Sequence, residues 1–193
     1  MKFSIFVCIT LFLGILTGHF YQINTGYIYE IVILLLIFII GIEVGQSFNL
    51  KELKKIGTIG ILLPCLTFIG SFLGGIVCAY FLNIGLKWGG AIAAGCGWYS
   101  LTGPIIAKKS AFFGIIGFLA NFIRELIVIL IYPFIIKKLR REIVISIGGA
   151  TTMDTTLPLI AKFGDYEMVL IALIHGVIIT LLIPILLPII LSF

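Results

Sequence analysis

The sequence predicts an all-α integral membrane protein with about five to seven transmembrane helices, one or two of which are broken or re-entrant. Of its 193 residues, 61% are hydrophobic and only 11% are charged, and the mean hydropathy is +1.28. Such a composition cannot provide a water-soluble surface. Apolar stretches of about 20 residues, the length that crosses a bilayer, follow one another along the chain with short polar breaks. This pattern leaves no room for a soluble domain.

Seven segments have the length and the apolar character of a membrane span. They are residues 3–21, 27–45, 56–82, 88–107, 111–136, 143–162 and 168–192. The first resembles a signal peptide, but no small-residue cleavage site follows it, so we expect it to remain as a span. We therefore predict a single multi-pass membrane domain over residues 1–193, with a helical pair over 1–55 and a core over 56–193.

The basic residues, which give the chain a net charge of +5, lie in short connectors between the spans. The positive-inside rule places such residues on the cytoplasmic side, so they orient the protein and do not indicate nucleic-acid binding. The two strongest clusters are Lys51, Lys54 and Lys55, and Lys137, Lys138, Arg140 and Arg141. If both clusters are cytoplasmic, an even number of crossings must separate them.

Three apolar segments lie between these clusters, so one of them should not cross the membrane. The segment 88–107 is the best candidate, because its small and helix-breaking residues suit re-entrant backbone better than a lipid-facing helix. These residues include Gly95, Gly97, Ser100, Gly103 and Pro104. This arrangement leaves Lys108 and Lys109 on the outer side of the membrane. Two lysines outside violate the positive-inside rule less than the four basic residues Lys137, Lys138, Arg140 and Arg141 would. Seven true crossings are the alternative.

A weak internal repeat sets the same segment apart. Residues 89–108 and 148–162 both open with Gly-Gly-Ala and close with Pro-[Ile/Leu]-Ile-Ala-Lys, and the second copy contains Gly148, Gly149 and Pro158. With one crossing between them, the two copies would enter the membrane from opposite faces, as inverted repeats do in many transporters. The alternative is chance similarity between membrane segments rich in glycine and proline.

Glu125 lies near the middle of the apolar segment 111–136, where a carboxylate costs several kcal/mol unless it faces a partner, a cavity or water. At helical spacing it shares a stripe of small and polar residues, Gly114, Gly117, Asn121 and Tyr132, which predicts a buried face. Its neighbour Arg124 points about 100° away and so needs another partner. A static salt bridge that cements helices is the alternative for the Arg124 and Glu125 pair.

Asp154 lies in a membrane-length segment, within a run of glycines and threonines that includes Thr152 and Thr155. Such a run suggests unwound backbone, which offers carbonyl and hydroxyl groups to cations. An interfacial loop with a solvated aspartate is the alternative. Together with Glu125, Asp154 suits a cationic substrate or an exchanged proton. His175, in segment 168–192, is either a proton relay or a hydrogen-bonded structural histidine.

The four cysteines do not indicate a metal site. Cys8, Cys65, Cys78 and Cys96 all lie within apolar stretches and show no CxxC spacing. We expect them to be small packing residues, and we expect neither disulfides, metal nor cofactor.

Several ordered motifs resemble those of the LysO-type lysine exporter family of bacterial and archaeal inner membranes. The resemblance covers residues 85–192 and rests on GCGWYSLTGP at 95–104, NFIRELI at 121–127, GGATTMDTTLP at 148–158, Glu167-Met168-Val169 and Ile174-His175-Gly176. It implies that the acidic residues Glu125 and Asp154 take part in lysine export. Family members that carry both halves in one chain are longer, so a separate small membrane subunit or a homo-oligomer would supply the remainder.

The residues and the resemblance together predict an inner-membrane transporter that exports L-lysine or related basic amino acids by proton antiport. Glu125 and Asp154 would alternately hold the substrate ammonium group and protons, assisted by residues of the same segments. These are Arg124, Asn121, Thr152, Thr155, Ser100 and His175. One alternative is a non-transporting subunit of a membrane complex. The other, an intramembrane hydrolase that uses Ser100 or Asp154 with His175, is disfavoured because the chain has no G-x-S-x-G or H-E-x-x-H motif.

Overall fold

The computed structural model describes residues 56–193 without a gap, together with scattered positions between 9 and 42. The scattered positions are 9–10, 12–14, 16–18, 20–21, 28, 31–32, 34–35, 38–39 and 42. The chain divides into two units, Met1–Gly41 and Ile42–Phe193. In the first unit every described position except Tyr21 is helical. The lysines of the first basic cluster lie outside the described residues, and the fold below is that of the second unit.

Three long helices of this unit are long and apolar enough to cross a membrane: α4 (Ile59–Phe81), α7 (Ala111–Ile135) and α10 (Tyr166–Ser192). At a rise of 1.5 Å per residue, each is roughly 35–40 Å long. These three helices are the candidate spans among the described residues, which is fewer than the predicted five to seven. Large apolar side chains remain exposed along them, among them Leu66, Leu73, Ile115, Leu130 and Ile185. An apolar surface of this kind is suited to lipid.

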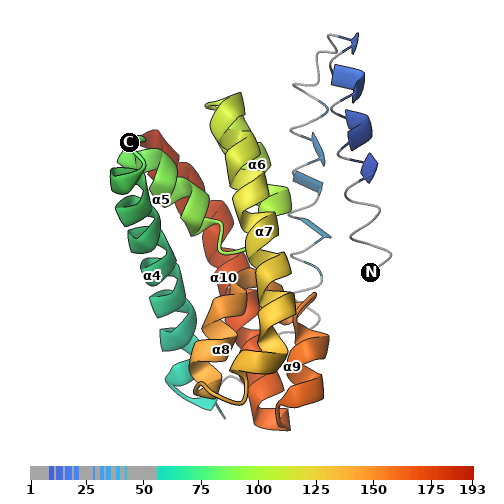
Figure 1. Ribbon diagram of the computed structural model, residues 1–193, viewed down its shortest axis with the longest axis vertical. Coiled ribbons are helices and arrows are strands. Elements are labelled where there is room, and N and C mark those ends of the chain that lie inside the picture. Colours follow the sequence, from blue (N-terminus) through green and yellow to red (C-terminus); the bar gives the residue numbers. More distant parts are fainter. Residues whose placement is uncertain are drawn as a thin grey trace. The chain divides into compact units, whose positions relative to one another are not determined.

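The long helices alternate in direction. In Figure 1, α4 and α10 run upward and α7 runs downward between them in sequence. The end of the bundle at which α4 begins is therefore also the end at which α7 finishes and α10 begins. The Lys137–Arg141 connector follows α7 at this end.

The predicted segment 88–107 is a helical hairpin made of α5 (Leu86–Ala94) and α6 (Tyr99–Ala107), joined by residues 95–98. The ring of Trp88, at its start, stacks at 4.5 Å on that of Phe113, which follows its end. The hairpin therefore returns to the side from which it came. It packs closely on α4, because Gly75 and Gly89 approach so tightly that a Cβ on either would overlap the other's backbone.

The predicted segment 143–162 is a second hairpin, made of α8 (Arg141–Gly148), the 3₁₀ helix η1 (Gly149–Met153) and α9 (Leu157–Phe163). Arg141 at its start lies 2.9 Å from the carboxylate of Glu167 just after its end. This hairpin too returns to its own side. Because α7 leads from one hairpin to the other, the two hairpins enter the bundle from opposite ends (Figure 1).

The predicted repeat matches the structure only in its second part. Pro104 and Pro158 both lie in the outgoing helix of a hairpin, α6 and α9. The Gly-Gly-Ala triplets, however, occupy different places: residues 89–91 lie within α5 against α4, whereas residues 148–150 form the tip of the second hairpin. The structural counterpart of the second triplet is the tip at residues 95–97. An alignment that pairs the two Gly-Gly-Ala triplets therefore places residues 89–91 of the first hairpin opposite the wrong part of the second hairpin.

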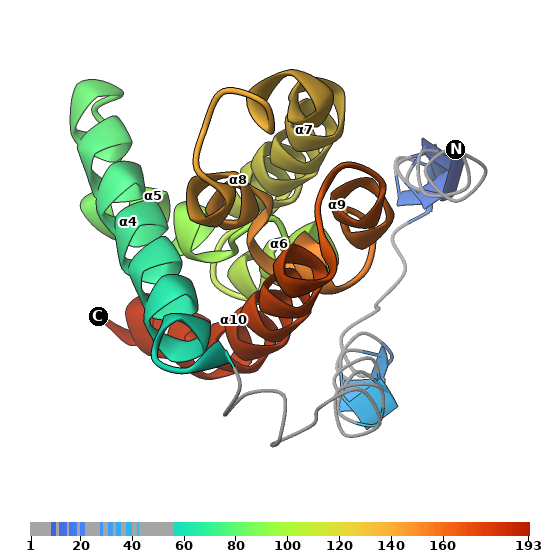
Figure 2. The same cartoon turned by 90° about the horizontal axis from the view of Figure 1, so that it is seen from below.

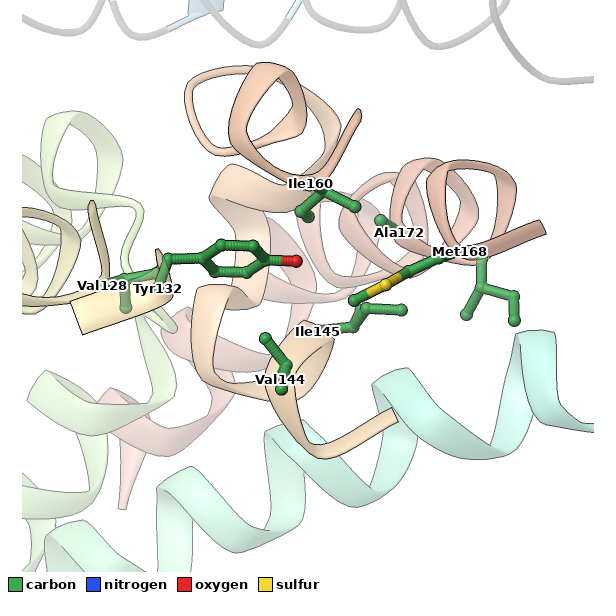
Figure 3. Packing of buried hydrophobic residues seen from close by; sticks show 8 residues of the cluster. Val128, Tyr132, Val144, Ile145, Ile160, Met168 and Ala172 are labelled. Atoms are coloured by element: carbon green, nitrogen blue, oxygen red, sulfur yellow. The ribbon is translucent and has the colours of Figure 1, made fainter. Parts of the chain in front are cut away.

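A hydrophobic cluster holds the second hairpin between α7 and α10. Its buried members are Val128, Tyr132, Val144, Ile145, Ile160, Met168, Ile171 and Ala172 (Figure 3). Figure 2, seen from this end, shows α8 between α4, α7 and α10, and α9 beside α10. The tip of the second hairpin is thereby fixed in the interior of the bundle.

Candidate functional site

The tips of the two hairpins, which are residues 95–98 and residues 148–156, meet inside the bundle. The amide of Ala150 donates a hydrogen bond of 2.9 Å to the carbonyl of Cys96. Both tips contain residues with positive φ, which are Cys96 (45°), Gly97 (92°) and Gly149 (64°). Cys96 is fully buried. Irregular backbone is tolerated at membrane depth where it is buried in protein, and it leaves polar groups available for a site.

Asn121 supports the first tip from α7. Its Nδ2 donates to the carbonyls of Ile92 (2.8 Å) and Gly117 (2.9 Å), and its Oδ1 accepts from the amide of Gly97 (2.7 Å). A Cβ on Gly95 would overlap Thr102 and lie 2.8 Å from Asn121 Nδ2. The Asn121 amide is thus used by the protein itself, and its role is to position the tip.

Gly103, Pro104 and Ser100 lie in α6, the outgoing helix of the first hairpin. A Cβ on Gly103 would lie 2.7 Å from the Cβ of Phe118, so this glycine permits the close approach of α6 to α7. Pro104 lies within the helix, and Ser100 is exposed in its first turn.

Glu125 and Asp154 come together between α7 and the second tip. The predicted stripe is confirmed, since Gly114, Gly117, Asn121, Glu125 and Tyr132 are all buried on one face of α7, and Glu125 is only 7% exposed. The Thr155 side chain and the charge of Asp154 both lie close enough to act on the Glu125 carboxylate.

Thr155 binds Asp154 directly. Its backbone amide and its hydroxyl both donate to Asp154 Oδ1, the hydroxyl at 3.0 Å. The Thr155 side chain therefore lies beside both carboxylates. Because two neighbouring carboxylates also repel each other, the pair is suited to hold a proton or a cationic group.

Arg124 points away from Glu125 and bonds neutral groups. Its Nε and Nη2 donate to the carbonyl of Ile147 at 3.4 and 3.3 Å, and its Nη1 donates to Ser71 Oγ at 3.2 Å. Ile147 lies in the last turn of α8, where the helix dipole favours a cation. The alternative of a static salt bridge between Arg124 and Glu125 is not the arrangement that the structure contains.

His175 is fully buried and connects three elements. Its Nε2 lies 3.0 Å from Thr67 Oγ1 of α4, and its Nδ1 lies 3.1 Å from Thr152 Oγ1 of η1. Thr152 also donates to the carbonyl of Gly149. Since threonines occupy both ring nitrogens, His175 is paired with neither Ser100 nor Asp154. The arrangement proposed for a hydrolase is therefore not formed.

The glycines and proline of the second tip have distinct positions. Gly148 and Gly149 are buried, and a Cβ on Gly149 would overlap the Cys96 carbonyl. Pro158 is exposed in the first turn of α9, near Asp154 and Thr155, which are also exposed on the described unit. Of the predicted residues, Glu125, Asp154 and Thr155 form one group, and Thr152 and His175 form another.

Sequence reasoning missed Thr67 and Ser71, which hold His175 and Arg124. Both are hydroxyl residues in an otherwise apolar stretch of α4, four positions apart and hence on one helix face. The spacing of these two hydroxyl residues could have indicated a polar, protein-facing side of α4.

Comparison with known proteins identifies the family. Residues 8–191 match the family model described as lysine exporter LysO. The chain belongs to the lysine exporter LysO family. The resemblance noted over residues 85–192 is thus confirmed and extends over nearly the whole chain. Together with its apolar helices, this membership makes the chain a membrane protein of a transporter family.

Two relatives match most of this chain. The lysine exporter LysO of Escherichia coli is 33% identical over 159 residues, which are 81% of this chain and 52% of the relative. A candidate lysine exporter of Haemophilus influenzae is 33% identical over 164 residues, 84% of this chain and 83% of the relative. The chain therefore spans about half the length of the Escherichia coli relative. No solved structure matches it.

Proposed function

We propose that this chain exports L-lysine or related basic amino acids across the inner membrane in exchange for protons. Its membership of the LysO family supports the substrate class. The observation that carries the proposal is the acidic pair: Glu125, buried on α7, lies near Asp154 of the second tip and near Thr155, which binds Asp154. The Thr155 side chain and the Asp154 carboxylate both act on Glu125. A cation bound between Glu125 and Asp154 would balance the negative charge of the two carboxylates.

The acidic pair provides a physical basis for exchange. An acidic side chain at the centre of a membrane helix costs about 2.5–3.5 kcal/mol, so the protein gains when a positive charge accompanies it. An ammonium group and a proton both supply that charge and would compete for the same oxygens. Binding of one would therefore favour release of the other, which is the requirement for antiport.

The arrangement of the helices supports an alternating-access transporter. In this proposal the hairpins α5–α6 and α8–α9 re-enter the membrane from opposite faces, and their tips meet near its middle. The end that carries Lys137–Arg141 is cytoplasmic, because basic connectors lie on that side. Residues 56–193 form the transport core, and segments 3–21 and 27–45 add two crossings to the three long helices. The chain assembles as a homo-oligomer or with a separate small membrane subunit.

Thialysine, a toxic lysine analogue, tests the proposal in cells. In an exporter-deficient strain, the wild-type chain should restore thialysine resistance, and the double variant Glu125→Gln, Asp154→Asn should not. Glu167→Gln is the matched control, because Glu167 is an exposed acid in a surface ion pair with Arg141. Equal protein levels in the membrane must be shown by immunoblot. Full resistance in cells that carry the double variant would refute the role of the acidic pair.

Reconstitution separates a transporter from a non-transporting subunit. Liposomes that contain only this chain should show flux of labelled lysine when an opposing proton gradient is applied. If flux requires a second protein, the chain is a subunit and the proposal holds only for the complex.

A further inference from the structure

Two cavities run along α4 on either side of Arg124. The first, of about 420 Å³, lies between α4, α5 and α7 and extends from Leu82 and Ile84 to Arg124. The second, of about 400 Å³, lies between α4 and α8 and extends from Leu63 and Glu142 to Ser71 and Ile147. Both volumes are within the range of sites for small molecules. Because Leu82 follows the end of α4 and Leu63 lies near its start, the cavities lead toward opposite ends of the bundle.

Arg124 lies at the boundary between these cavities. Ser71 lines both of them, and Arg124 lines the first. The guanidinium bridges Ser71 Oγ and the carbonyl of Ile147, and both of those residues line the second cavity. The guanidinium therefore lies between the two cavities.

The partners of Arg124 are weak for a charged donor. Its three hydrogen bonds are 3.2–3.4 Å long and go to a hydroxyl and a carbonyl. Bonds from a guanidinium to a carboxylate are shorter, about 2.7–2.9 Å, and roughly twice as strong as neutral ones. Within residues 56–193, the ion pairs join Arg140 and Arg141 to Glu142, Asp165 and Glu167, and none involves Arg124.

We propose that Arg124 binds the α-carboxylate of the transported amino acid where the two cavities meet. The inference rests on the proposed function and adds a specificity residue to it. A carboxylate would replace the neutral hydroxyl and carbonyl with a two-pronged acceptor that matches the planar guanidinium.

This role predicts discrimination between lysine and cadaverine, which is lysine without its carboxylate. In liposomes that contain the wild-type chain, cadaverine should compete with labelled lysine at least tenfold more weakly than unlabelled lysine does. The variant Arg124→Gln should slow lysine flux at least tenfold and should leave cadaverine flux within twofold of its wild-type value. Arg124→Lys, which keeps the charge, should retain part of the preference for lysine.

Arg140→Gln is the control, because Arg140 is an exposed base whose side chain is 82% accessible, and the preference for lysine should persist in it. The wild-type competition assay needs no variant, so it tests the proposal even if Arg124→Gln fails to fold. Equal competition by cadaverine and lysine in the wild-type chain would overturn the inference and leave the proposed function intact. An absence of flux of either compound, both for the wild-type chain alone and for the chain with any second protein that it requires, would instead overturn the proposed function, and the inference with it.

Discussion

Replacement of Gly149 by alanine should destabilise the contact between the two hairpin tips. Gly149 has φ +64° and ψ −132°, a backbone conformation that residues with a Cβ rarely adopt. Its added Cβ would overlap the carbonyl of Cys96, which accepts the hydrogen bond from Ala150, and would lie 3.3 Å from Arg124 Nη2. The substitution therefore strains one tip and displaces the acceptor on the other.

The expected cost follows from these two effects. A residue held in a disfavoured φ/ψ region costs roughly 1–3 kcal/mol, and the loss of a backbone hydrogen bond costs about 1 kcal/mol. The sum is about 2–4 kcal/mol. For a domain of this size, each kcal/mol shifts the melting temperature by roughly 2–4 °C, so we expect a decrease of about 5–15 °C.

Thiol labelling of the purified protein in detergent measures this decrease. Cys96 is fully buried at the tip contact, and Cys8, Cys65 and Cys78 are replaced by serine in every protein compared, so the reaction of Cys96 with a fluorogenic maleimide should report opening of the tips as the temperature rises. Gly70→Ala is the matched control, because no described atom lies within 4 Å of the added Cβ and alanine favours a helix. It should melt at or slightly above the wild-type temperature. If Gly149→Ala melted at the wild-type temperature, the described contact between the tips would be wrong.

Five further substitutions test other features of the structure. Asn121→Ala removes three hydrogen bonds and leaves the Gly97 amide unpaired, so thermal unfolding should show a loss of about 2–3 kcal/mol. His175→Ala creates a cavity between α4, η1 and α10 and should cost on the order of 3 kcal/mol in the same assay. Arg141→Ala breaks an exposed pair with Glu167 and should cost less than about 1 kcal/mol. In intact cells, an impermeant maleimide should label the Lys108→Cys variant and should not label the Lys138→Cys variant. Labelling of both variants would contradict the placement of the two hairpins at opposite ends of the bundle.

The buried face of α7 could be predicted because it is a local property. Small and polar residues recur at helical spacing in an otherwise lipid-facing segment, so Asn121 and Glu125 had to face protein. The partners of Arg124 could not be predicted in this way. Ser71 is 53 positions away in the chain, and the other acceptor is a backbone carbonyl, which carries no sequence signal.

The breaks in segments 88–107 and 143–162 could be predicted from their glycines and prolines, but the position of each tip could not. A glycine permits either close helix packing or a positive φ, and the sequence does not distinguish these uses. Gly89 serves the first use against α4, and Gly149 serves the second at a tip. The similar triplets therefore gave the wrong register. The pairing of Glu125 with Asp154 was proposed from charge, whereas the position of Thr155 beside them depends on the fold.

Equilibrium binding of labelled lysine to the purified chain tests most directly whether the acidic pair holds a positively charged solute. We expect Glu125→Gln to weaken lysine binding at least tenfold, and we expect Glu167→Gln to bind lysine as the wild-type chain does. Wild-type affinity in a folded Glu125→Gln protein would contradict the account.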